Sequence, residues 1–266
     1  MLQQAAGSSY AKLRRYIDVL HVLLSKDFRV KYRRTVLGYL WSLGTPLLMT
    51  GIFYLVFHRL ITNAFSSLDY IAHLLSGVFA WQWFSNSITG SVWSYLHNAA
   101  LVKKIVFPRW LVPCSLCIID GLHFLLAVPV IIAVLIWRGH SIDFLLCLYA
   151  FPIVFLLQLV FACSLAIICA SCNAFFRDIE RLVNLGMMLM FYLTPVMYPP
   201  ELIPPEWQQW LYLNPFALYM QCWRDILLAS AFPTLPLAAA GIATGLAVII
   251  SICVYRWLSP RFAEVL

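Results

Sequence analysis

The sequence is poor in charged residues, which make up only 11% of its 266 positions. Acidic residues are the scarcer kind, with 11 Asp and Glu against 18 Lys and Arg. The 63% of hydrophobic residues is more than a soluble globule can hide, so the composition excludes a soluble domain, a disordered chain and a coiled coil. In so apolar a chain, the excess positive charge favours contact with an anionic membrane surface over contact with nucleic acid.

Motifs that carry chemistry in soluble enzymes are also missing. The sequence has no glycine-rich phosphate loop, no Gly-rich dinucleotide turn, no Ser-His-Asp order and no His-Glu-x-x-His. Most of the eight cysteines fall in apolar segments, so they imply no disulfide framework, and the two Cys-x-x-Cys pairs match no zinc-finger spacing. We therefore expect no metal site in this chain, and we expect any driving energy to come from elsewhere.

Long apolar runs are what the sequence has instead. A hydrocarbon core of about 30 Å requires about 20 residues of helix. Six segments fit this requirement, of which the fifth is short and carries Pro195 in its last turn. They are residues 36–57, 70–89, 110–137, 144–172, 182–198 and 235–257. The predicted fold is all-α and polytopic, with six transmembrane helices in a single domain, residues 36–266.

Residues 1–35, which precede the first span, predict an amphipathic helix. Leu13, Leu20 and Leu24 belong to an apolar stripe at helical spacing, which should lie in the inner membrane interface. Only three of the 18 Lys and Arg residues fall in the segments on the other side of the membrane, namely Arg59, Arg138 and Arg224. Because positive residues are retained in the cytoplasm, both termini are predicted to be cytoplasmic.

The largest outer segment, residues 194–236, is rich in proline and in aromatic residues. Proline prevents a helix from crossing the bilayer there, so we expect short re-entrant helices that pack on protein or line a cavity. Two interpretations stay open: an amphipathic outer cap, or a gate over the outer end of a pathway. The candidate gate residues are Pro195, Pro199, Pro204, Trp207, Trp210 and Pro215.

The inner connection between the second and third spans, residues 98–110, combines an amphipathic stretch with two lysines and a Pro-Arg step. Lys103 and Lys104 are also explained as ordinary positive residues of a cytoplasmic loop. The segment as a whole is better explained as a rigid cytoplasmic helix that another protein pushes.

Two polar residues lie inside the third span. Asp120 is ten residues past Trp110, about 15 Å along a helix, which places it near the middle of the membrane. A carboxylate there costs at least about 2.5–3.5 kcal/mol, so we expect it to face a partner or water. His123, one turn further on, is the nearest candidate partner. A structural role in joining helices and a role in substrate contact both remain open.

Aromatic and amide side chains gather on particular faces of three spans. Rings present flat apolar surfaces along which a hydrated polymer can slide, although membrane-interface belts and lipid packing also explain many of them. The channel-lining candidates are Tyr39, Phe53 and Phe57 in the first span, Gln82, Trp83 and Asn86 in the second, and Phe191, Tyr192 and Tyr198 in the fifth.

Several sequence blocks, in this order, resemble a known family. They are SKDFRVKYRRTVLGYLWSLGTPLL at 25–48, GVFAWQWFSNSI at 77–88, NAALVKKIVFPR at 98–109, FFRDIERLVNLGMMLMFYLTPVMY at 175–198, YLNP at 212–215 and the terminal RFAEVL. Together they resemble the membrane subunits of ABC-2 exporters, and within that class the O-antigen polysaccharide permeases (Wzm-type), over nearly the whole chain.

The resemblance implies a homodimer with a channel at its interface, paired with two copies of a separate ATPase that binds ATP and Mg. The cargo would be an undecaprenyl-diphosphate-linked polysaccharide, carried from the cytoplasmic to the periplasmic side of the inner membrane. Closure of the ATPase would be transmitted by the N-terminal helix and by the segment that holds Asn98, Leu101, Val102, Lys103, Lys104, Phe107, Pro108 and Arg109.

The resemblance also makes Arg29, Lys31, Arg33 and Arg34 candidates to attract the lipid diphosphate, although they serve equally well as topology determinants. Alternatives to this function remain. They are export of another glycan, such as capsule or teichoic acid, export of a small lipid or drug, and a membrane-embedded enzyme on lipid-linked sugars with Asp120 and His123 as acid and base.

Overall fold

The computed structural model describes residues 2–32, 38, 40–60, 69–104 and 107–265. These residues form helices joined by turns, and no strand occurs among them. Four helical stretches are long and apolar enough to cross a membrane: Leu40–Phe57, Leu111–Trp137, Phe144–Phe175 and Thr234–Arg261. A helix satisfies its own backbone hydrogen bonds, which is what a hydrocarbon environment requires. The predicted all-helical membrane class is confirmed.

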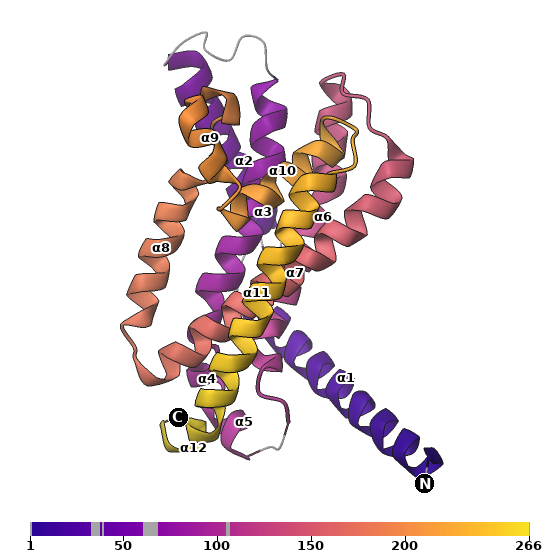
Figure 1. The fold of residues 1–266 in the computed structure, drawn as a ribbon, viewed down its shortest axis with the longest axis vertical. Coiled ribbons are helices and arrows are strands. Elements are labelled where there is room, and N and C mark those ends of the chain that lie inside the picture. The colour runs from indigo at the N-terminus through magenta and orange to yellow at the C-terminus, as the bar shows by residue number, and fades with distance from the viewer. Residues whose placement is uncertain (1, 33–37, 39, 61–68, 105–106, 266) are drawn as a thin grey trace.

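The helices are labelled in chain order (Figure 1). The long ones are α1 (Leu2–Tyr32), α3 (Tyr70–Ser91), α6 (Leu111–Trp137), α7 (Phe144–Phe175) and α11 (Thr234–Leu258). The shorter ones are α2 (Leu40–Phe53), continued by a π-helix at Tyr54–Leu60, then α4 (Ser94–His97), α5 (Ala99–Lys104), α8 (Ile179–Leu193), α9 (Pro205–Leu211), α10 (Pro215–Leu227) and α12 (Phe262–Val265). Two 3-10 turns, Pro200–Leu202 and Ser259–Arg261, precede α9 and α12.

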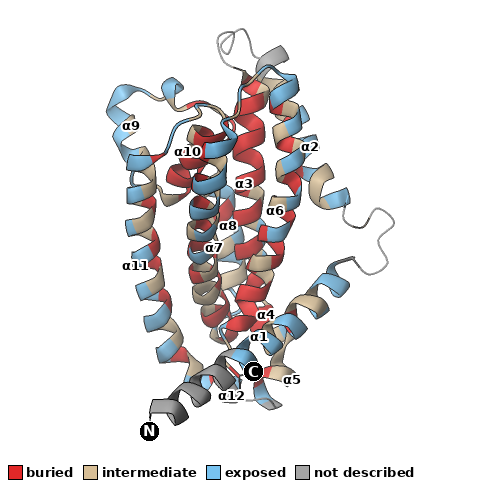
Figure 2. Cartoon of the chain, turned by 90° about the vertical axis from the view of Figure 1, so that its right-hand side faces the viewer, coloured by how far each residue is buried: buried red, intermediate tan, exposed pale blue. Residues whose placement is uncertain are grey.

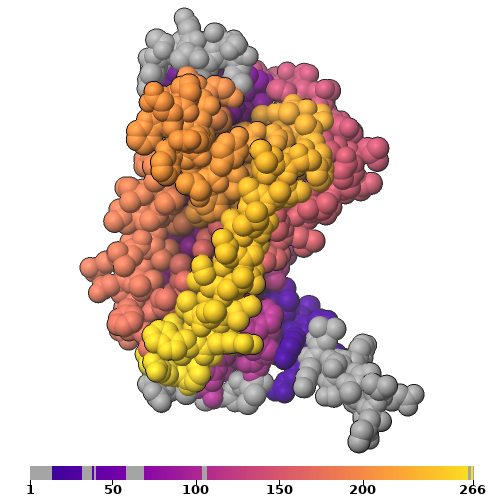
Figure 3. Space-filling model, viewed as in Figure 1, coloured from indigo at the N-terminus to yellow at the C-terminus, as the bar shows by residue number. Residues whose placement is uncertain are grey.

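Helix α3 is the centre of the bundle and is buried along nearly its whole length (Figure 2). It packs against α2, α6, α7, α8 and α10, and α11 runs along α7 across one face of the molecule (Figure 3). Both chain ends lie at one end of the bundle, with α1 slanting away from it, while α9 and the turn between α6 and α7 lie at the opposite end (Figure 1). Following the predicted topology, we call these the inner end and the outer end.

Four predicted spans agree closely with α3, α6, α7 and α11. The fifth, predicted as 182–198, is wrong at its end, because α8 stops at Leu193 and Thr194, the residue before Pro195, is extended with ψ of 135°. With 15 residues, α8 measures about 22 Å, less than the hydrocarbon core. The predicted start of the first span, at Val36, lies outside the described residues, and its helix is described from Leu40.

Buried apolar side chains form two clusters. The larger one fills the bundle between α3, α6, α7, α10 and α11. The smaller one lies at the inner end, where Leu23 of α1, Val102 of α5, Phe107 and Phe262 of α12 meet. The inner cluster therefore joins the N-terminal helix, the connection between the second and third predicted spans, and the C-terminus in one packed unit.

Candidate functional site

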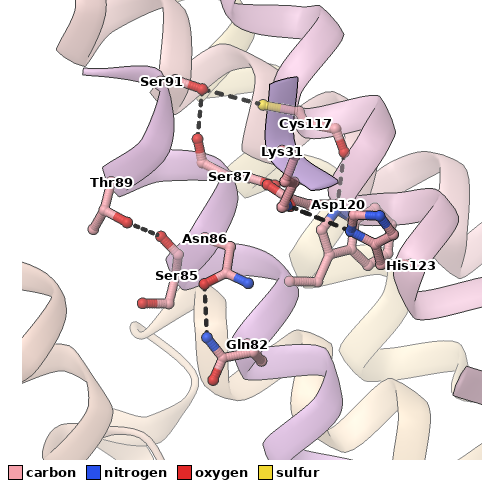
Figure 4. A network of polar contacts seen from close by, with 11 residues as sticks. Lys31, Gln82, Ser85, Asn86, Ser87, Thr89, Ser91, Cys117, Asp120 and His123 are labelled. Atoms are coloured by element: carbon pink, nitrogen blue, oxygen red, sulfur yellow. Dashed lines mark hydrogen bonds and ion pairs between the residues drawn. The ribbon is translucent and has the colours of Figure 1, made fainter. Parts of the chain in front are cut away.

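Asp120 of α6 lies where three helices meet near the inner end (Figure 4). Its Oδ1 atom is 2.5 Å from the Nζ atom of Lys31 in the last turn of α1. Ser87 of α3 donates a hydrogen bond to Oδ2 at 3.4 Å, and the Nδ1 atom of His123 lies 3.8 Å from Oδ1. Asp120 is only 5% exposed, whereas the Lys31 side chain is 40% exposed. The pair thus joins a buried acid to a base that reaches water or lipid headgroups.

The expectation that Asp120 faces a partner is confirmed, and His123, the candidate named from the sequence, is one of its neighbours. His123 is adjacent, yet the shortest contact of the carboxylate is with Lys31, which is 89 residues away in sequence. No local sequence pattern predicts such a pair, because the two residues meet only when α1 packs on α6. Lys31, predicted to attract a lipid diphosphate, is engaged with Asp120. Arg29 is exposed, and Arg33 and Arg34 lie outside the described residues.

Two cavities border the Lys31–Asp120 pair. One has a volume of about 240 Å³ and is lined by Trp41, Gln82, Trp83 and His123 among others. The other, of about 540 Å³, extends to His97 and Asn98 at the inner end. Both are lined by Lys31, Asn86 and Asp120. We call the two cavities together the inner vestibule.

The walls of the inner vestibule carry amide and charged side chains that pair with one another. Gln82 donates to Asn86 at 2.7 Å, and Lys26 donates to Asn98 at 2.5 Å. Amides offer both donors and acceptors and carboxylates offer acceptors, which is what a ligand rich in hydroxyl groups requires. The exposed indole ring of Trp41 in the same wall can stack on the apolar faces of such a ligand. Within this chain, the inner vestibule has the chemistry of a site for a polar, hydroxyl-bearing ligand.

Apart from Trp83, the other described channel-lining candidates do not line the inner vestibule. Trp83 contributes to its wall but is packed between Phe124 and Phe155, with ring centroids 5.2 and 4.7 Å away. Phe53 stacks on Phe191 at 5.8 Å. The ring of Phe57 contacts Phe53 in the same aromatic group. Tyr192 and Tyr198 are linked by a bond from the Tyr198 hydroxyl to the Tyr192 carbonyl, and Tyr39 lies outside the described residues. Because the rings of Phe191 and Tyr192 also lie 5.5 Å apart, the described candidates form two groups, one at the inner vestibule and one around Phe191.

The predicted coupling segment, residues 98–109, is anchored to three other parts of the chain. Val102 and Phe107 are buried in the inner cluster, and Leu101 packs against it. The Arg109 guanidinium donates to the Ser259 carbonyl at 2.8 Å and lies 5.9 Å from the Phe262 ring.

The remaining described members of the coupling segment either form contacts near its two ends or are exposed. Asn98 accepts from Lys26 of α1, the Pro108 carbonyl accepts from the Leu111 amide, and Lys103 is exposed. The side chain of Lys104 lies outside the described residues. A push on this segment would therefore act on α1 and on the C-terminal end of α11.

The proline-rich segment divides into an exposed part and a buried part. In α9, Trp207 and Trp210 are 62% and 56% exposed, with Pro199 and Pro204 preceding the two short helical turns. Pro215 begins α10, which is capped by Asn214 and buried along most of its length. An outer cap over the bundle is thus the wrong description for residues 215–227, because α10 lies inside it, between α3, α7 and α11.

Polar side chains of α10 hold it in the bundle. Trp223 donates to the Oε1 atom of Gln158 in α7 at 2.6 Å, and the Tyr219 hydroxyl is 2.5 Å from the Thr244 hydroxyl in α11. Arg224, expected in an outer loop, is only 6% exposed and donates to the Pro195 carbonyl at 2.6 Å. The burial of this arginine was not predicted, although its place in the apolar run around CWRDIL was a usable signal.

An ion pair at the outer end joins α3 to the turn after α6. Arg138 donates two hydrogen bonds to Asp69, from Nε at 3.1 Å and from Nη2 at 3.0 Å, and His140 lies 3.1 Å away. Burial raises the pKa of Asp69, but the hydrogen bonds from Arg138 and His140 outweigh it, so the pKa lies below its ordinary value. Asp69 also caps α3 by accepting from the Ala72 amide.

No cluster of three or more His, Cys, Asp or Glu side chains suited to a metal ion occurs among the described residues. The fold and site define a multi-pass helical membrane protein with a polar vestibule near one end and a broken, proline-rich segment near the other. The family model for ABC-2 type transporters matches residues 18–228, and the chain belongs to that family. It is a transport subunit, and the predicted resemblance is confirmed.

Several curated proteins are similar to the chain over most of its length. An O-antigen export system permease protein RfbA of Klebsiella pneumoniae is 38% identical over 249 residues, covering 94% of this chain and 95% of its own. A protein of the same description from Myxococcus xanthus is 29% identical over 237 residues, or 87% and 90% of the two chains. The polysialic acid transport protein KpsM of Escherichia coli is 20% identical over 213 residues, or 79% and 81%.

Proposed function

We propose that the chain is the permease subunit of an ATP-driven exporter of lipid-linked O-antigen polysaccharide in a bacterial inner membrane. The observation that carries the proposal is the 38% identity, over 94% of the chain, with a protein described as an O-antigen export permease. The amide-rich and indole-lined inner vestibule supports it, because these groups suit a hydrated sugar polymer better than a drug. Export of a capsule glycan is the alternative, favoured less by the 20% identity with KpsM.

In this proposal the chain has six spans, which are the four most apolar helical stretches together with α3 and α8. Both termini lie in the cytoplasm. Two copies form the channel, and two separate ATPase subunits supply energy by binding ATP and Mg. The ATPase subunits contact the chain at the coupling segment. Because this segment is anchored on α1 and near the end of α11, a movement of it is passed on to the whole inner end. Residues 194–215 form the outer gate.

Lys31 and Asp120 act together when the substrate enters. A diphosphate that reaches the inner vestibule competes with the carboxylate for the ammonium group of Lys31, which is partly exposed and therefore free to turn. Arg29 adds positive charge on the same helix end. His123, 3.4 Å from the Lys31 ammonium, stays beside Asp120 and supports the carboxylate when Lys31 leaves.

The test is complementation of a Gram-negative strain that lacks this chain. The wild-type chain restores polymer at the cell surface, and purified chain alone hydrolyses no ATP. Asp120→Asn reduces surface polymer and leaves lipid-linked polymer inside the cell. Asp143→Asn is the matched control, because Asp143 caps α7 through backbone amides and asparagine caps equally well. Normal surface polymer without the chain, or a purified chain that turns over substrate alone, would contradict the proposal.

A further inference from the structure

The segment between α8 and α9 is held at every residue from Thr194 to Tyr198, at Thr194 through the side-chain hydroxyl and at the other four through the backbone carbonyl. Arg224 donates from Nη2 to the carbonyls of Pro195 and Val196, at 2.6 and 3.3 Å. The Tyr70 hydroxyl donates to the Met197 carbonyl at 2.6 Å. The remaining contacts are Asn214 to the Thr194 hydroxyl at 2.9 Å and His73 to the Tyr198 carbonyl at 3.2 Å. We call Tyr70, His73, Asn214 and Arg224 the outer clasp.

Helix α3 leaves space for the outer clasp at a single glycine. A Cβ atom on Gly77 would lie 2.9 Å from the Arg224 Nη2 atom and 3.1 Å from the Val196 carbonyl oxygen. Both distances are too short for a methyl group, so alanine would push the guanidinium and the held backbone apart. Gly77 therefore fixes how closely the broken segment approaches the centre of the bundle.

Arg224 is the member of the clasp with unused bonding capacity. Its Nε and Nη1 atoms are buried and have no hydrogen-bond partner among the described residues. Carbonyl oxygens supply only partial negative charge, and no carboxylate forms an ion pair with the guanidinium in the described part of the chain. A buried guanidinium with free donors gains stability from any carboxylate that reaches it, because charge-assisted and bidentate bonds are the stronger kind.

Glu201 is placed to be that carboxylate. It lies on the exposed 3-10 turn Pro200–Leu202, five residues after the carbonyl of Val196 that Arg224 holds. Asp225, the residue after Arg224, already accepts a bond from Gln221 at 2.6 Å. Because Glu201 belongs to the same backbone stretch, a shift of that stretch moves the carboxylate relative to Arg224.

We propose that Arg224 is the positioning residue that holds segment 194–198, and with it the outer gate, in the closed position, and that Glu201 replaces the two carbonyl oxygens when the segment moves. The inference rests on the proposed function, since it describes the gate of that exporter. It gives the broken segment two discrete arrangements, which is what a gate driven from the other end of the molecule needs.

The experiment measures two rates in proteoliposomes that contain the chain and its ATPase. Release of a small trapped dye without ATP reports whether the gate is closed, and ATP-driven movement of lipid-linked polymer reports whether it opens. Arg224→Gln should insert, release dye at least about ten-fold faster than wild type, and keep this leak without ATP. Glu201→Gln should stay tight but export several-fold less polymer. Arg138→Gln, which removes an arginine from the outer ion pair, is the control and should match wild type in both rates.

Dye release separates this inference from the proposed function, because it requires no polymer. A tight Arg224→Gln protein, or polymer export by Glu201→Gln at the wild-type rate, overturns the inference while leaving the proposed function standing. Where Arg224→Gln fails to insert, Gly77→Ala decides: a leak supports the clasp, and a tight membrane overturns it. If wild type moves no O-antigen polymer but Arg224→Gln leaks, the proposed function fails and the role of Arg224 in closing the pathway holds.

Discussion

Two buried charged side chains, Asp120 towards the inner end and Arg224 towards the outer end, are held in opposite ways. Asp120 has a charged partner in Lys31, which is 40% exposed and borders two cavities. Arg224 is bonded to backbone carbonyls and has no charged partner among the described residues. An ion pair next to open space can exchange its partners, whereas a buried guanidinium on carbonyl groups fixes a backbone. In the roles that we propose, similar burial serves entry of a ligand in one region and closure of a segment in the other.

The largest effect should come from the tryptophans of the proline-rich segment, which test whether α10 belongs to the bundle. Trp223 is fully buried and bonded to Gln158. Trp223→Ala should lower the free energy of unfolding by about 3–5 kcal/mol, seen as a large drop in melting temperature in detergent. Trp207→Ala is the control, because Trp207 is 62% exposed and should change stability by about 0.5 kcal/mol or less. Equal effects of the two substitutions would place α10 outside the bundle.

The next effect concerns the space that α3 leaves for the outer clasp. Gly77→Ala should lower the free energy of unfolding by about 1–3 kcal/mol, because the new methyl group meets Arg224 and the Val196 carbonyl. Gly90→Ala, on the same helix, has nothing within 4 Å of the new Cβ atom and should be neutral or stabilising by about 0.5–1 kcal/mol. Melting temperatures of the two variants in the same detergent check the difference. A Gly77→Ala protein as stable as wild type would mean that the residues of the outer clasp can shift to accommodate a methyl group.

A smaller effect is expected at the inner ion pair. Asp120→Asn keeps the shape of the side chain but frees Lys31, which can be solvated where it stands. We expect a loss of about 1–2 kcal/mol of unfolding free energy, between the values for exposed and for fully buried pairs. Asp178→Asn is the control, since Asp178 is exposed and forms no side-chain cap. A loss as large as that of Trp223→Ala would show that the inner pair is a structural anchor after all.

The smallest effect is the pH dependence of the outer ion pair. Because the pKa of Asp69 is lowered in the folded protein, its stabilising contribution is complete above its unfolded pKa of about 3.9 and is lost as pH falls through the lower folded pKa. Asp69→Asn, which keeps the cap on α3, should melt slightly lower than wild type at pH 6, by about 1 kcal/mol or less in unfolding free energy. The difference should shrink as pH falls below the unfolded pKa of about 3.9. A difference that does not shrink would assign it to something other than the ion pair.

Apolar run length predicted the helices α3, α6, α7 and α11 well, because a membrane span is encoded by a local run of residues. Pro195 was visible in the sequence, yet its effect on Thr194 ended α8 earlier than hydropathy alone indicated. Short re-entrant helices that pack on protein or line a cavity were expected in residues 194–236, but the composition did not indicate which of them would lie inside the bundle. The interior position of α10 depends on partners in α3, α7 and α11 that are distant in sequence.

The candidate site was predicted in parts only. The need of Asp120 for a partner followed from the cost of an intramembrane carboxylate, but Lys31 as that partner did not, because the two residues are 89 positions apart. Gln82 and Asn86 share a helix face and could be grouped from spacing. Arg224 and Gly77 could not be joined, since their contact depends on how a re-entrant helix packs on α3.

The most direct test compares the Asp120→Asn and Arg224→Gln variants, each reconstituted with the ATPase in its own proteoliposomes. Dye release and polymer export are measured on the same preparation of each variant. The account predicts opposite profiles: Asp120→Asn stays tight and exports less, whereas Arg224→Gln leaks dye without ATP. Two variants that respond alike, both tight or both leaking, would contradict it.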